Sequence, residues 1–432
     1  MRFHQVRVSV IAIFCLVLTV LSLSPTTISA QAASPTAATA QPAYSRIDPT
    51  TNHRVMLLTT EPNSKGLYFT DNAFTPDGTQ MIYVASQSIY ALDMTTYKSR
   101  KLVAGPVDDV VVGRKSPIVY FMRTGDTSLY AVGVNTGRLL KLTDLPKGAT
   151  ISTLNSDETL AAGTSSDVEP PKHPEHADHR ATLIDDRLAD HVPMTLFTVN
   201  LTTAQVNPIL HSTDWLNHPQ FSPTDPTLLM YCHEGPWQKV DRIWTIRADG
   251  SNNKLIHQRT VNGEIAGHEF WDADGVTIWY DLQIPRGQNF YLASYNTVTG
   301  ARTWYSVDRD AWSIHYAVTP SHLLMAGDGA GEGNISRSKN ARWINLFTPN
   351  QSLVPTEIDQ TKLVQSGFLA TEHLANMAHH NYSEIEPNVR FSPDHKLVIF
   401  TSTMSGPNVL GPSYIFAVEV AKAPPPVAAG GQ

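Results

Sequence analysis

The chain has 432 residues, of which 41% are hydrophobic and 16% charged, and its formal net charge is -7 at pH 7. This composition allows a large buried core, and all-β barrels and propellers are single domains that commonly reach such lengths. The negative charge argues against nucleic acid as a general partner, because phosphate backbones are bound by clusters of Lys and Arg. A weakly acidic surface is compatible with a soluble enzyme.

The first residues have the pattern of a secretory signal. Arg2 and Arg7 precede the apolar run VSVIAIFCLVLTVLSL, and small residues around ISA and AQA follow it. The run is shorter than the ~20 residues needed to cross a bilayer, so a cleaved signal is favoured over an uncleaved anchor. We therefore predict a signal peptide over residues 1–33, no membrane span after its cleavage, and an exported protein that is periplasmic or secreted.

Two flexible segments and the cysteines frame the folded part of the chain. Residues 34–45 and 422–432 are rich in Ala, Pro, Thr and Gly without periodicity, which predicts a linker and a tail. Cys15 lies in the predicted signal, which leaves Cys232 as the single mature cysteine. An internal disulfide is thereby excluded, and core burial has to stabilise the domain predicted over residues 46–421.

A hairpin pattern repeats through this domain. Each copy has an apolar residue, a turn of Ser, Thr, Pro, Asp or Gly, and a short apolar run, as in NAFTPDGTQMIYVA and PQFSPTDPTLLMYC. A second hairpin, such as SIYALDMTTYKSRKLV, follows most copies. Two hairpins form a four-stranded antiparallel sheet, and about seven such units predict an all-β fold, a seven-bladed β-propeller. We expect HRVMLLTT to close the ring as the outermost strand of the last blade; a two-sheet sandwich is the alternative, but it does not repeat a four-stranded unit.

Polar residues recur at one position of these repeats, three residues before the apolar residue that opens each turn. This position starts the innermost strand of a blade, from which side chains project into the central channel. Unsatisfied polar groups there destabilise a fold unless a ligand or metal pairs with them. We expect a functional cluster, with a structural hydrogen-bonding role as the alternative for each single histidine. The residues at this position are Asp71, Ile151, His218, His268, His315 and Asn388.

The chemistry of such a cluster leaves two roles open. Imidazole nitrogen combined with carboxylate or carboxamide oxygen suits a divalent cation such as Mn²⁺. Neutral imidazole is equally suited to act as a general base near neutral pH. The segment CHEGPW adds His233 and Glu234 to the same part of the chain.

Several long motifs resemble one known family. They are HPQFSPTDPTLLMYCHEGPW, VDRIW, AGHEFW, SIHYAV followed by AGDGAG, and EPNVRFSPD. With these motifs the chain resembles the oligogalacturonate lyase family, polysaccharide lyase family twenty-two. The resemblance implies a seven-bladed propeller that cleaves short, often unsaturated, galacturonides by β-elimination, with a manganese-type ion in the channel mouth. Carried over by motif, the catalytic base falls on His268, the arginine that neutralises the uronate carboxylate on Arg242, and one metal ligand on His315.

The chain departs from the better-known members of that family at the last blade. Where they have a Gln-x-x-His-Pro-His pattern, this chain has Ser383, Glu386 and Asn388. We expect Glu386 and Asn388 to offer oxygen ligands, and His379 or His380 of MAHHNY to offer nitrogen. Such an oxygen-richer set favours Mn²⁺, Mg²⁺ or Ca²⁺.

Other residues receive broader predictions. A tyrosine such as Tyr316 or Tyr382, a water, or the base itself is a candidate for protonating the leaving oxygen. The insertion PPKHPEHADHRATLIDDRLADH is expected to be a solvated loop or short helix. Trp237, Trp244, Trp271 and Trp312 are expected to fill space between blades, with a sugar-stacking face on one of them as the alternative. His218, His233, Glu234 and Arg286 are predicted to bind the acidic oligosaccharide or to support the residues that bind it.

Two alternative functions remain open at this level. One is a binding propeller without catalysis, similar to the TolB translocation protein, since the fold alone does not specify chemistry. The other is a propeller lyase that acts on a different uronate-containing glycan. A scaffold has no reason to direct His268, Arg242 and His315 to one point, so the arrangement of these three residues separates an enzyme from a scaffold.

Overall fold

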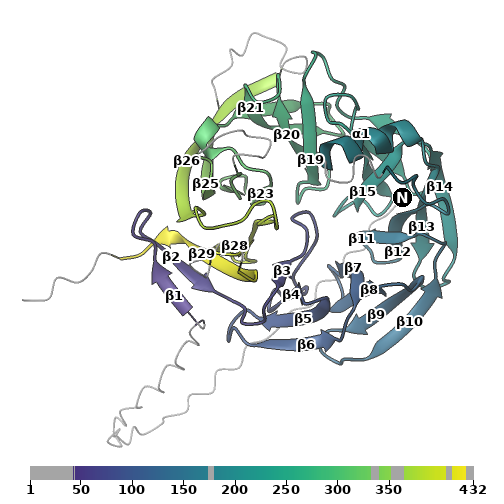
Figure 1. Cartoon of the computed structure of the whole chain (residues 1–432), viewed down its shortest axis with the longest axis horizontal. Coiled ribbons are helices and arrows are strands. Elements are labelled where there is room, and N and C mark those ends of the chain that lie inside the picture. Colours follow the sequence, from purple (N-terminus) through teal and green to yellow (C-terminus); the bar gives the residue numbers. More distant parts are fainter. Residues whose placement is uncertain are drawn as a thin grey trace, which may run out of the picture. The chain divides into compact units, whose positions relative to one another are not determined.

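The computed structural model describes residue 42 and residues 44–173, 180–331, 340–351, 364–404 and 411–424. The predicted signal peptide, most of the linker and most of the tail lie outside the described residues. The folded unit lies within residues 40–432, and Figure 1 shows its sheets following one another around a common centre. No helix in the described ranges has the length and apolarity that a bilayer crossing requires.

Most of the described chain is β-strand. The strands of the first three blades are β3 (Ser64–Gly66), β4 (Gln80–Ala85), β5 (Ser88–Asp93), β6 (Ser99–Val103), β7 (Val107–Val112), β8 (Ile118–Arg123), β9 (Ser128–Gly133), β10 (Leu139–Asp144), β11 (Thr150–Leu154), β12 (Leu160–Ser165), β13 (Met194–Asn200) and β14 (Val206–Ser212). The strands of the next three are β15 (Trp215–Phe221), β16 (Leu228–Glu234), β17 (Ile243–Arg247), β18 (Lys254–Leu255), β19 (Ile265–Trp271), β20 (Thr277–Gln283), β21 (Phe290–Asn296), β22 (Arg302–Ser306), β23 (Tyr316–Val318), β24 (Met325–Gly327), β25 (Trp343–Gln351) and β26 (Val364–Asn376). The last blade contains β27 (Arg390–Phe391), β28 (Leu397–Ser402), β29 (Tyr414–Lys422), β2 (His53–Leu57) and β1 (Tyr44–Ile47).

The strand pairing confirms the predicted propeller. Four sheets contain four strands each, and the 8-stranded sheet consists of two such units joined where β22 runs parallel to β26. The 5-stranded sheet is the last blade, in which β2 pairs with β29 as predicted. One detail differs, because β1 pairs along the outer edge of β2. The segment HRVMLLTT therefore closes the ring but is not its outermost strand.

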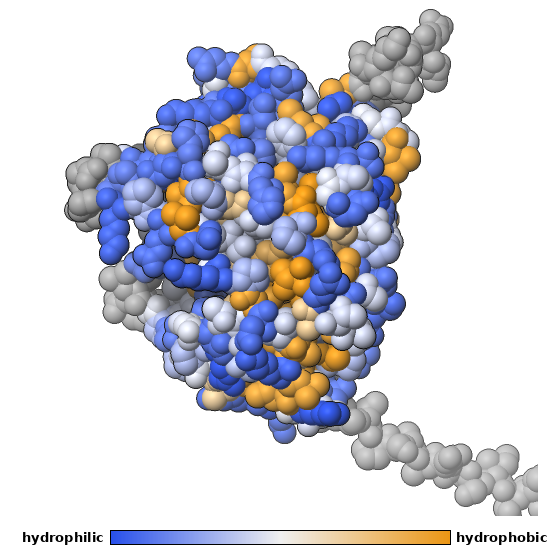
Figure 2. Space-filling model, turned by 90° about the vertical axis from the view of Figure 1, so that its right-hand side faces the viewer, coloured by the Kyte–Doolittle hydropathy of each residue, from blue (hydrophilic) through white to orange (hydrophobic). Residues whose placement is uncertain are grey.

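Burial follows the position of a strand within its blade. The second strand β4 is buried along nearly its whole length, whereas the outer strand β10 is exposed along most of its length. Central strands are covered on both faces because the neighbouring blades pack against them; Ile82 of β4 and Phe121 of β8, for example, share one core cluster. The side of the molecule in Figure 2 is mainly hydrophilic, with hydrophobic residues in separate small groups. The core thus lies between the blades.

Two shorter elements interrupt the strands. Residues of the His-rich insertion between β12 and β13 form helix α1 (Arg180–Asp190), and Arg309–Ala311 form a single 3₁₀ turn, η2. An ion pair of 2.5 Å joins Asp185 of α1 to Lys239 in the β16–β17 loop. This surface ion pair links the helix to the loop that also carries Trp237.

The innermost strands contain β-bulges at the position where the sequence places its polar residues. The register of β7, β15 and β19 shifts beside Asp109, His218 and His268, and these residues have φ angles of 50°, 48° and 47°. Asp, Asn and His are the non-glycine residues that best tolerate this left-handed conformation. A bulge changes the direction of the side chain that it carries. The backbone thus explains both the repeated position and the types of residue found there.

Candidate active site

His268 of β19 is oriented by a carboxylate from the neighbouring strand. Its Nδ1 lies 2.8 Å from Oδ1 of Asp281 in β20, and the two side chains are 10% and 0% exposed. A carboxylate only accepts hydrogen bonds, so the proton lies on Nδ1 and the Nε2 lone pair is free. Burial acts to lower the pKa of His268, but the charge and hydrogen bond of Asp281 outweigh it and raise the pKa above its ordinary value. The residue has the orientation and the basicity of a general base.

His315 repeats this arrangement one blade further on. Its Nδ1 lies 2.7 Å from Oδ2 of Asp328, and both side chains are fully buried. Asp328 also accepts hydrogen bonds from the backbone N–H groups of Ile314, His315 and Asn388. The ring of His315 lies 5.1 Å from that of His268 in an edge-to-face contact. Two carboxylate-oriented histidines are therefore neighbours.

Arg242, which precedes β17, lies under a tryptophan and between two glutamates. Its guanidinium makes a two-pronged ion pair with Glu234 of β16, and Nη2 lies 4.0 Å from Oε2 of Glu269. Burial works against the charged form, but the neighbouring acidic groups raise the pKa of Arg242. The Trp237 ring lies over the guanidinium at 5.3 Å and meets the His268 ring edge to face at 5.0 Å. Trp237 thus covers the site, whereas the sequence predicted that it fills space between blades.

The predicted substrate-binding residues divide into two groups. His218 joins the site, since its Nε2 lies 3.5 Å from Oε2 of Glu234. His233 precedes Glu234 in β16 and therefore faces the opposite side of the strand; its ring stacks on Trp244 at 4.8 Å. Arg286 lies in the turn after β20, outside the inner-strand position that carries His268, where its backbone N–H donates to Gly263.

The predicted metal ligands also fall into two groups, those that lie together and those that are hydrogen-bonded elsewhere. Glu386 lies close to His315, with 3.7 Å between Oε2 and Nε2. The carboxamide of Asn388 is hydrogen-bonded to the backbone: Oδ1 accepts from the Phe69 N–H and Nδ2 donates to the Glu386 carbonyl. Both ring nitrogens of His380 already have partners, the Ser402 hydroxyl and the Ile385 carbonyl. The structure therefore brings together His315 and Glu386. Asn388 and His380, which were also predicted as metal ligands, use their side-chain polar atoms in hydrogen bonds within the protein.

These donors fit a divalent cation in part. Nε2 of His315 is buried and has no hydrogen-bond partner among the described residues, and a histidine whose Nδ1–H is held by a carboxylate is the usual form of a metal ligand. Glu386 adds a carboxylate oxygen, which divalent cations also accept. Within the described ranges, however, there is no group of three His, Cys, Asp or Glu residues that would form a complete site.

The charges around the histidines are unbalanced. The Arg242 guanidinium pairs with Glu234 and lies near Glu269, and further carboxylates lie beside His268 and His315. A ligand that is itself an anion would be repelled unless histidines are protonated or a cation is bound. The carboxylates are those of Glu234, Glu269, Asp281, Asp328 and Glu386.

Two aromatic residues of the first blade enter the site without having been predicted. The Tyr68 ring stacks on His218 at 5.4 Å and meets His315 edge to face at 5.4 Å. The Phe69 ring packs on His315 at 4.4 Å. Burial, followed by the nearby charges of Glu386 and Glu269, raises the pKa of Tyr68 well above its ordinary value, so its hydroxyl stays protonated.

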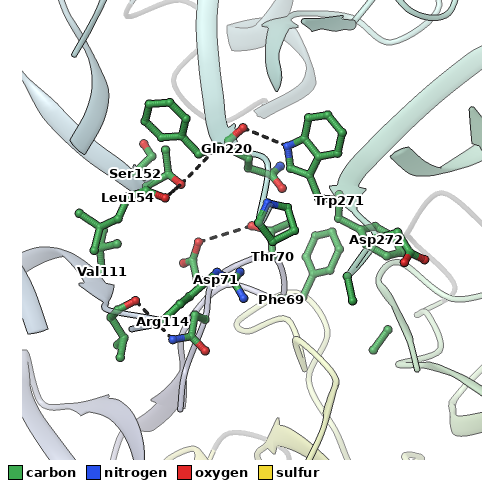
Figure 3. Close-up of a pocket in the computed structure, with 18 of the residues that line it drawn as sticks. Phe69, Thr70, Asp71, Val111, Arg114, Ser152, Leu154, Gln220, Trp271 and Asp272 are labelled. Carbon is green, nitrogen blue, oxygen red and sulfur yellow. Dashed lines mark hydrogen bonds between the residues drawn. The ribbon is translucent and has the colours of Figure 1, made fainter. Parts of the chain in front are cut away.

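A cavity of about 230 Å³ lies on the inner strands beside Phe69 (Figure 3). Trp271 donates a hydrogen bond of 3.0 Å to the Gln220 carbonyl, and the Thr70 hydroxyl lies 3.5 Å from Asp71. Arg114 and Asp71 point into the same cavity. Burial raises the pKa of Asp71 to about 6, against the opposing effect of Arg390. Asp71, predicted for the ring of polar residues, therefore lines this cavity, where its charge interacts with His218.

The orienting carboxylates were also missed, although the sequence carries a signal for them. Asp281 follows His268 by 13 positions and Asp328 follows His315 by 13 positions. This spacing is that of the first and second strands of one blade, so the two residues face each other across a hairpin. A different signal, the alignment of the repeats, could have located Asp109. It precedes Val112 by three residues in a weaker copy of the repeat.

The family of the chain follows from comparison with known proteins. A family model described as oligogalacturonate lyase matches residues 42–419. The chain belongs to the oligogalacturonate lyase family. This family consists of carbon–oxygen lyases, and the resemblance predicted from the motifs is confirmed.

Individual relatives agree with this assignment. The chain is 27% identical over 379 residues to an oligogalacturonide lyase of Pectobacterium atrosepticum, covering 78% of this chain and 87% of the relative. It is 25% identical over 364 residues to an oligogalacturonate lyase of Dickeya dadantii, with the same coverage.

Two solved structures share the fold of this oligogalacturonate lyase family member. One is an oligogalacturonate lyase in complex with manganese, with a TM-score of 0.70, 22% identity, and coverage of 89% of this chain and 99% of that one. The other is an oligogalacturonate lyase from Vibrio parahaemolyticus, with a TM-score of 0.71, 20% identity, and coverage of 88% and 97%. At these identities the likeness establishes the propeller fold.

Proposed function

We propose that this protein is an exported oligogalacturonate lyase that cleaves short, often unsaturated, galacturonides by metal-assisted β-elimination. The observation that carries the proposal is the His268–Asp281 pair, whose imidazole ring contacts that of His315 and shares the Trp237 ring with Arg242. A binding scaffold would gain nothing from a buried histidine oriented in this way. Family membership supplies the substrate class.

His268 acts as the base in this proposal. The proton at C5 of a uronate is only weakly acidic, because its removal places negative charge on a group whose carboxylate is already ionised. Asp281 holds the proton of the neutral imidazole on Nδ1, so Nε2 is the atom that receives the C5 proton. The carboxylate of Asp281 then stabilises the imidazolium that forms.

Arg242 provides a fixed positive charge for the uronate carboxylate. Part of that charge is already balanced by Glu234, and Glu269 lies close by. The excess of carboxylates supports an additional cation, which His315 Nε2 and Glu386 would hold. When bound, a divalent ion such as Mn²⁺, or alternatively Mg²⁺ or Ca²⁺, would supply positive charge against the substrate carboxylate.

A cleavage assay tests the proposal. The protein without its predicted signal is incubated with saturated and unsaturated digalacturonate, with added Mn²⁺, Mg²⁺ or Ca²⁺ or with chelator, and products are identified by mass. We expect cation-dependent release of unsaturated or keto-deoxyuronate monomers. A folded protein that cleaves neither substrate with any cation would refute the proposal, and cleavage of another uronide would reassign the substrate.

Two variants connect the activity to the site. His268→Ala should lower kcat by about 10²- to 10⁴-fold, the usual contribution of a positioned acid or base. His211→Ala is the matched control, because His211 is exposed on outer strand β14 and contacts only the Thr195 hydroxyl among the described residues. If both variants keep the wild-type rate, His268 is not the base.

Export is part of the proposal and rests on the sequence of residues 1–33. When the full chain is expressed, the mature protein should be recovered outside the cytoplasm with its amino terminus near residue 34. Amino-terminal sequencing of that material would decide this, and recovery of the intact chain from the cytoplasm would contradict it.

A further inference from the structure

The inner strand of the first blade is interrupted in a way that the other inner strands are not. Its first half, β3, pairs with Tyr83–Ala85, and Phe74 pairs with Met81. The residues between, from 67 to 72, leave this ladder and extend toward the centre of the ring. This segment, which we call the 67–72 loop, takes the place of the single bulged residue found in β15 and β19.

The last blade holds the 67–72 loop in place. Arg390 donates hydrogen bonds to the carbonyls of Leu67, Tyr68 and Asp71, and Asn388 Oδ1 accepts from the Phe69 N–H at 3.0 Å. Arg390 is only 7% exposed, so these bonds are shielded from water. The loop is therefore a fixed part of the site.

Tyr68 stands out among the tyrosines near the histidines because its hydroxyl is unused. In the described part of the chain, that hydroxyl has no hydrogen-bond partner, and the side chain is partly exposed. By contrast, the hydroxyl of buried Tyr316 accepts from the Ser313 N–H, and that of buried Tyr382 donates to the Asp328 carbonyl. Both tyrosines predicted as proton donors are thus buried, and their hydroxyls bind backbone groups inside the protein.

The reaction requires a second group besides the base. In a galacturonide ring the C5 hydrogen and the C4 oxygen lie on opposite faces. A base that takes the C5 proton on one face cannot donate a proton to O4 on the other. His268 and Tyr68 come from different blades, and both rings border His315, at 5.1 Å and 5.4 Å.

We infer that Tyr68 is a catalytic residue that donates its hydroxyl proton to the leaving O4. This inference rests on the proposed lyase function. His268 takes the C5 proton, the C5–H electrons form the C4–C5 double bond, and the C4–O4 bond breaks. O4 receives that bond's electrons and the Tyr68 proton. Exchange with solvent then returns a proton to the phenolate and removes one from His268, so no net proton is consumed.

Tyr68→Phe tests the inference, because phenylalanine keeps the stacking on His218 and removes only the hydroxyl. Two substrates are compared: digalacturonate, and a galacturonide with fluoride at C4. Fluoride leaves as an anion and needs no proton. We expect kcat on digalacturonate to fall by about 10²- to 10⁴-fold, and the rate on the fluoride to change by less than about threefold.

Tyr130→Phe is the matched control, since it removes a tyrosine hydroxyl that donates to Asp126 within the second blade. It should keep both rates within about threefold. Equal slowing of both substrates by Tyr68→Phe would show a structural role, and an unchanged rate on digalacturonate would also overturn the inference. If the wild-type protein itself fails on digalacturonate, the proposed function fails instead.

Discussion

The charge on Asp281 should contribute to the rate separately from its effect on the orientation of His268. Oδ1 of Asp281 holds Nδ1 of His268, whereas Oδ2 is buried and has no hydrogen-bond partner among the described residues. An asparagine can therefore direct its carboxamide oxygen to Nδ1 and its NH₂ group to the Oδ2 position. Asp281→Asn should preserve the tautomer of His268 and remove the negative charge.

The expected loss follows from the strength of the hydrogen bond. Bonds to charged groups contribute about 1.5–3 kcal/mol and neutral ones about 0.5–1.5 kcal/mol, so the variant loses about 1 to 2 kcal/mol of imidazolium stabilisation. This corresponds to a decrease in kcat of about 5- to 30-fold. Asp281→Ala also removes the orientation and should reach about 10²- to 10⁴-fold.

The pH dependence gives an independent test. A base works when deprotonated, so kcat/KM falls as the pH drops below the pKa of His268. That pKa is raised by Asp281 against the effect of burial, so the acidic limb of the wild-type pH profile lies at higher pH than an ordinary histidine would give. In Asp281→Asn the limb should move to lower pH, because burial then acts without the opposing charge.

Steady-state kinetics on digalacturonate from pH 5 to 9 measure both effects. Asp272→Asn is the matched control: it alters a buried aspartate of the same blade that accepts from the Trp279 indole N–H. It should leave the limb in place. The reasoning would be refuted if Asp281→Ala kept the wild-type rate. It would also be refuted if the acidic limb of the kcat/KM profile of Asp281→Asn stayed in place or moved to higher pH.

Three further predictions concern the cation, the arginine and stability. Arg242→Lys should lower kcat/KM by about tenfold to a hundredfold, because a point charge cannot replace the forked contact with Glu234; a near-normal rate would remove Arg242 from the site. His315→Ala should weaken Mn²⁺ binding by more than about tenfold in calorimetry on the folded protein, whereas unchanged binding would exclude His315 as a ligand. Glu264, buried at 1% exposure, has a pKa lowered from 4.5 to about 2, because hydrogen bonds from His257 and Thr260 outweigh burial. Its carboxylate stabilises the fold fully above pH 4.5, by about 3 kcal/mol, and this is lost as the pH falls toward 2. Urea unfolding should therefore show the advantage of the wild type over Glu264→Gln shrinking between pH 5 and 3, and a constant difference would contradict this.

The blades could be predicted from the sequence because each one repeats the same local chemistry. The turn of TPDG, where Gly78 has a φ of 69° and the Thr75 N–H bonds to the Gln80 carbonyl, recurs in other first hairpins, as at Asp272–Thr277 with Gly275 at 72° and Ser392–Leu397 with His395 at 57°. The alignment of these turns also located His218, His268 and His315 at one position. By contrast, β1 has no counterpart in the repeat, so its place outside β2 could not be inferred.

The residues that were missed or misplaced depend on contacts between distant segments. Tyr68 and Phe69 lie in the 67–72 loop, which departs from the repeat and is held by Arg390 from the other end of the chain. His233 was assigned with its neighbour Glu234, although consecutive strand residues face opposite sides. His380 was chosen for its nitrogen, which the Ile385 carbonyl already uses.

The left-handed conformation of the bulge also limits how much a polar residue at the start of an inner strand indicates about function. The φ angles of His218, His268 and Asn388, 48°, 47° and 55°, favour His, Asn or Asp for backbone reasons alone. A histidine at this position is therefore weak support for chemistry. The neighbouring strand makes the distinction: 13 residues after His268 and His315 the chain has aspartates, but 13 residues after His218 it has Tyr231. Among the described residues, no carboxylate pairs with Nδ1 of His218, and its Nε2 lies near Glu234 instead. We therefore assign proton transfer to His268 and cation binding to His315, and neither role to His218.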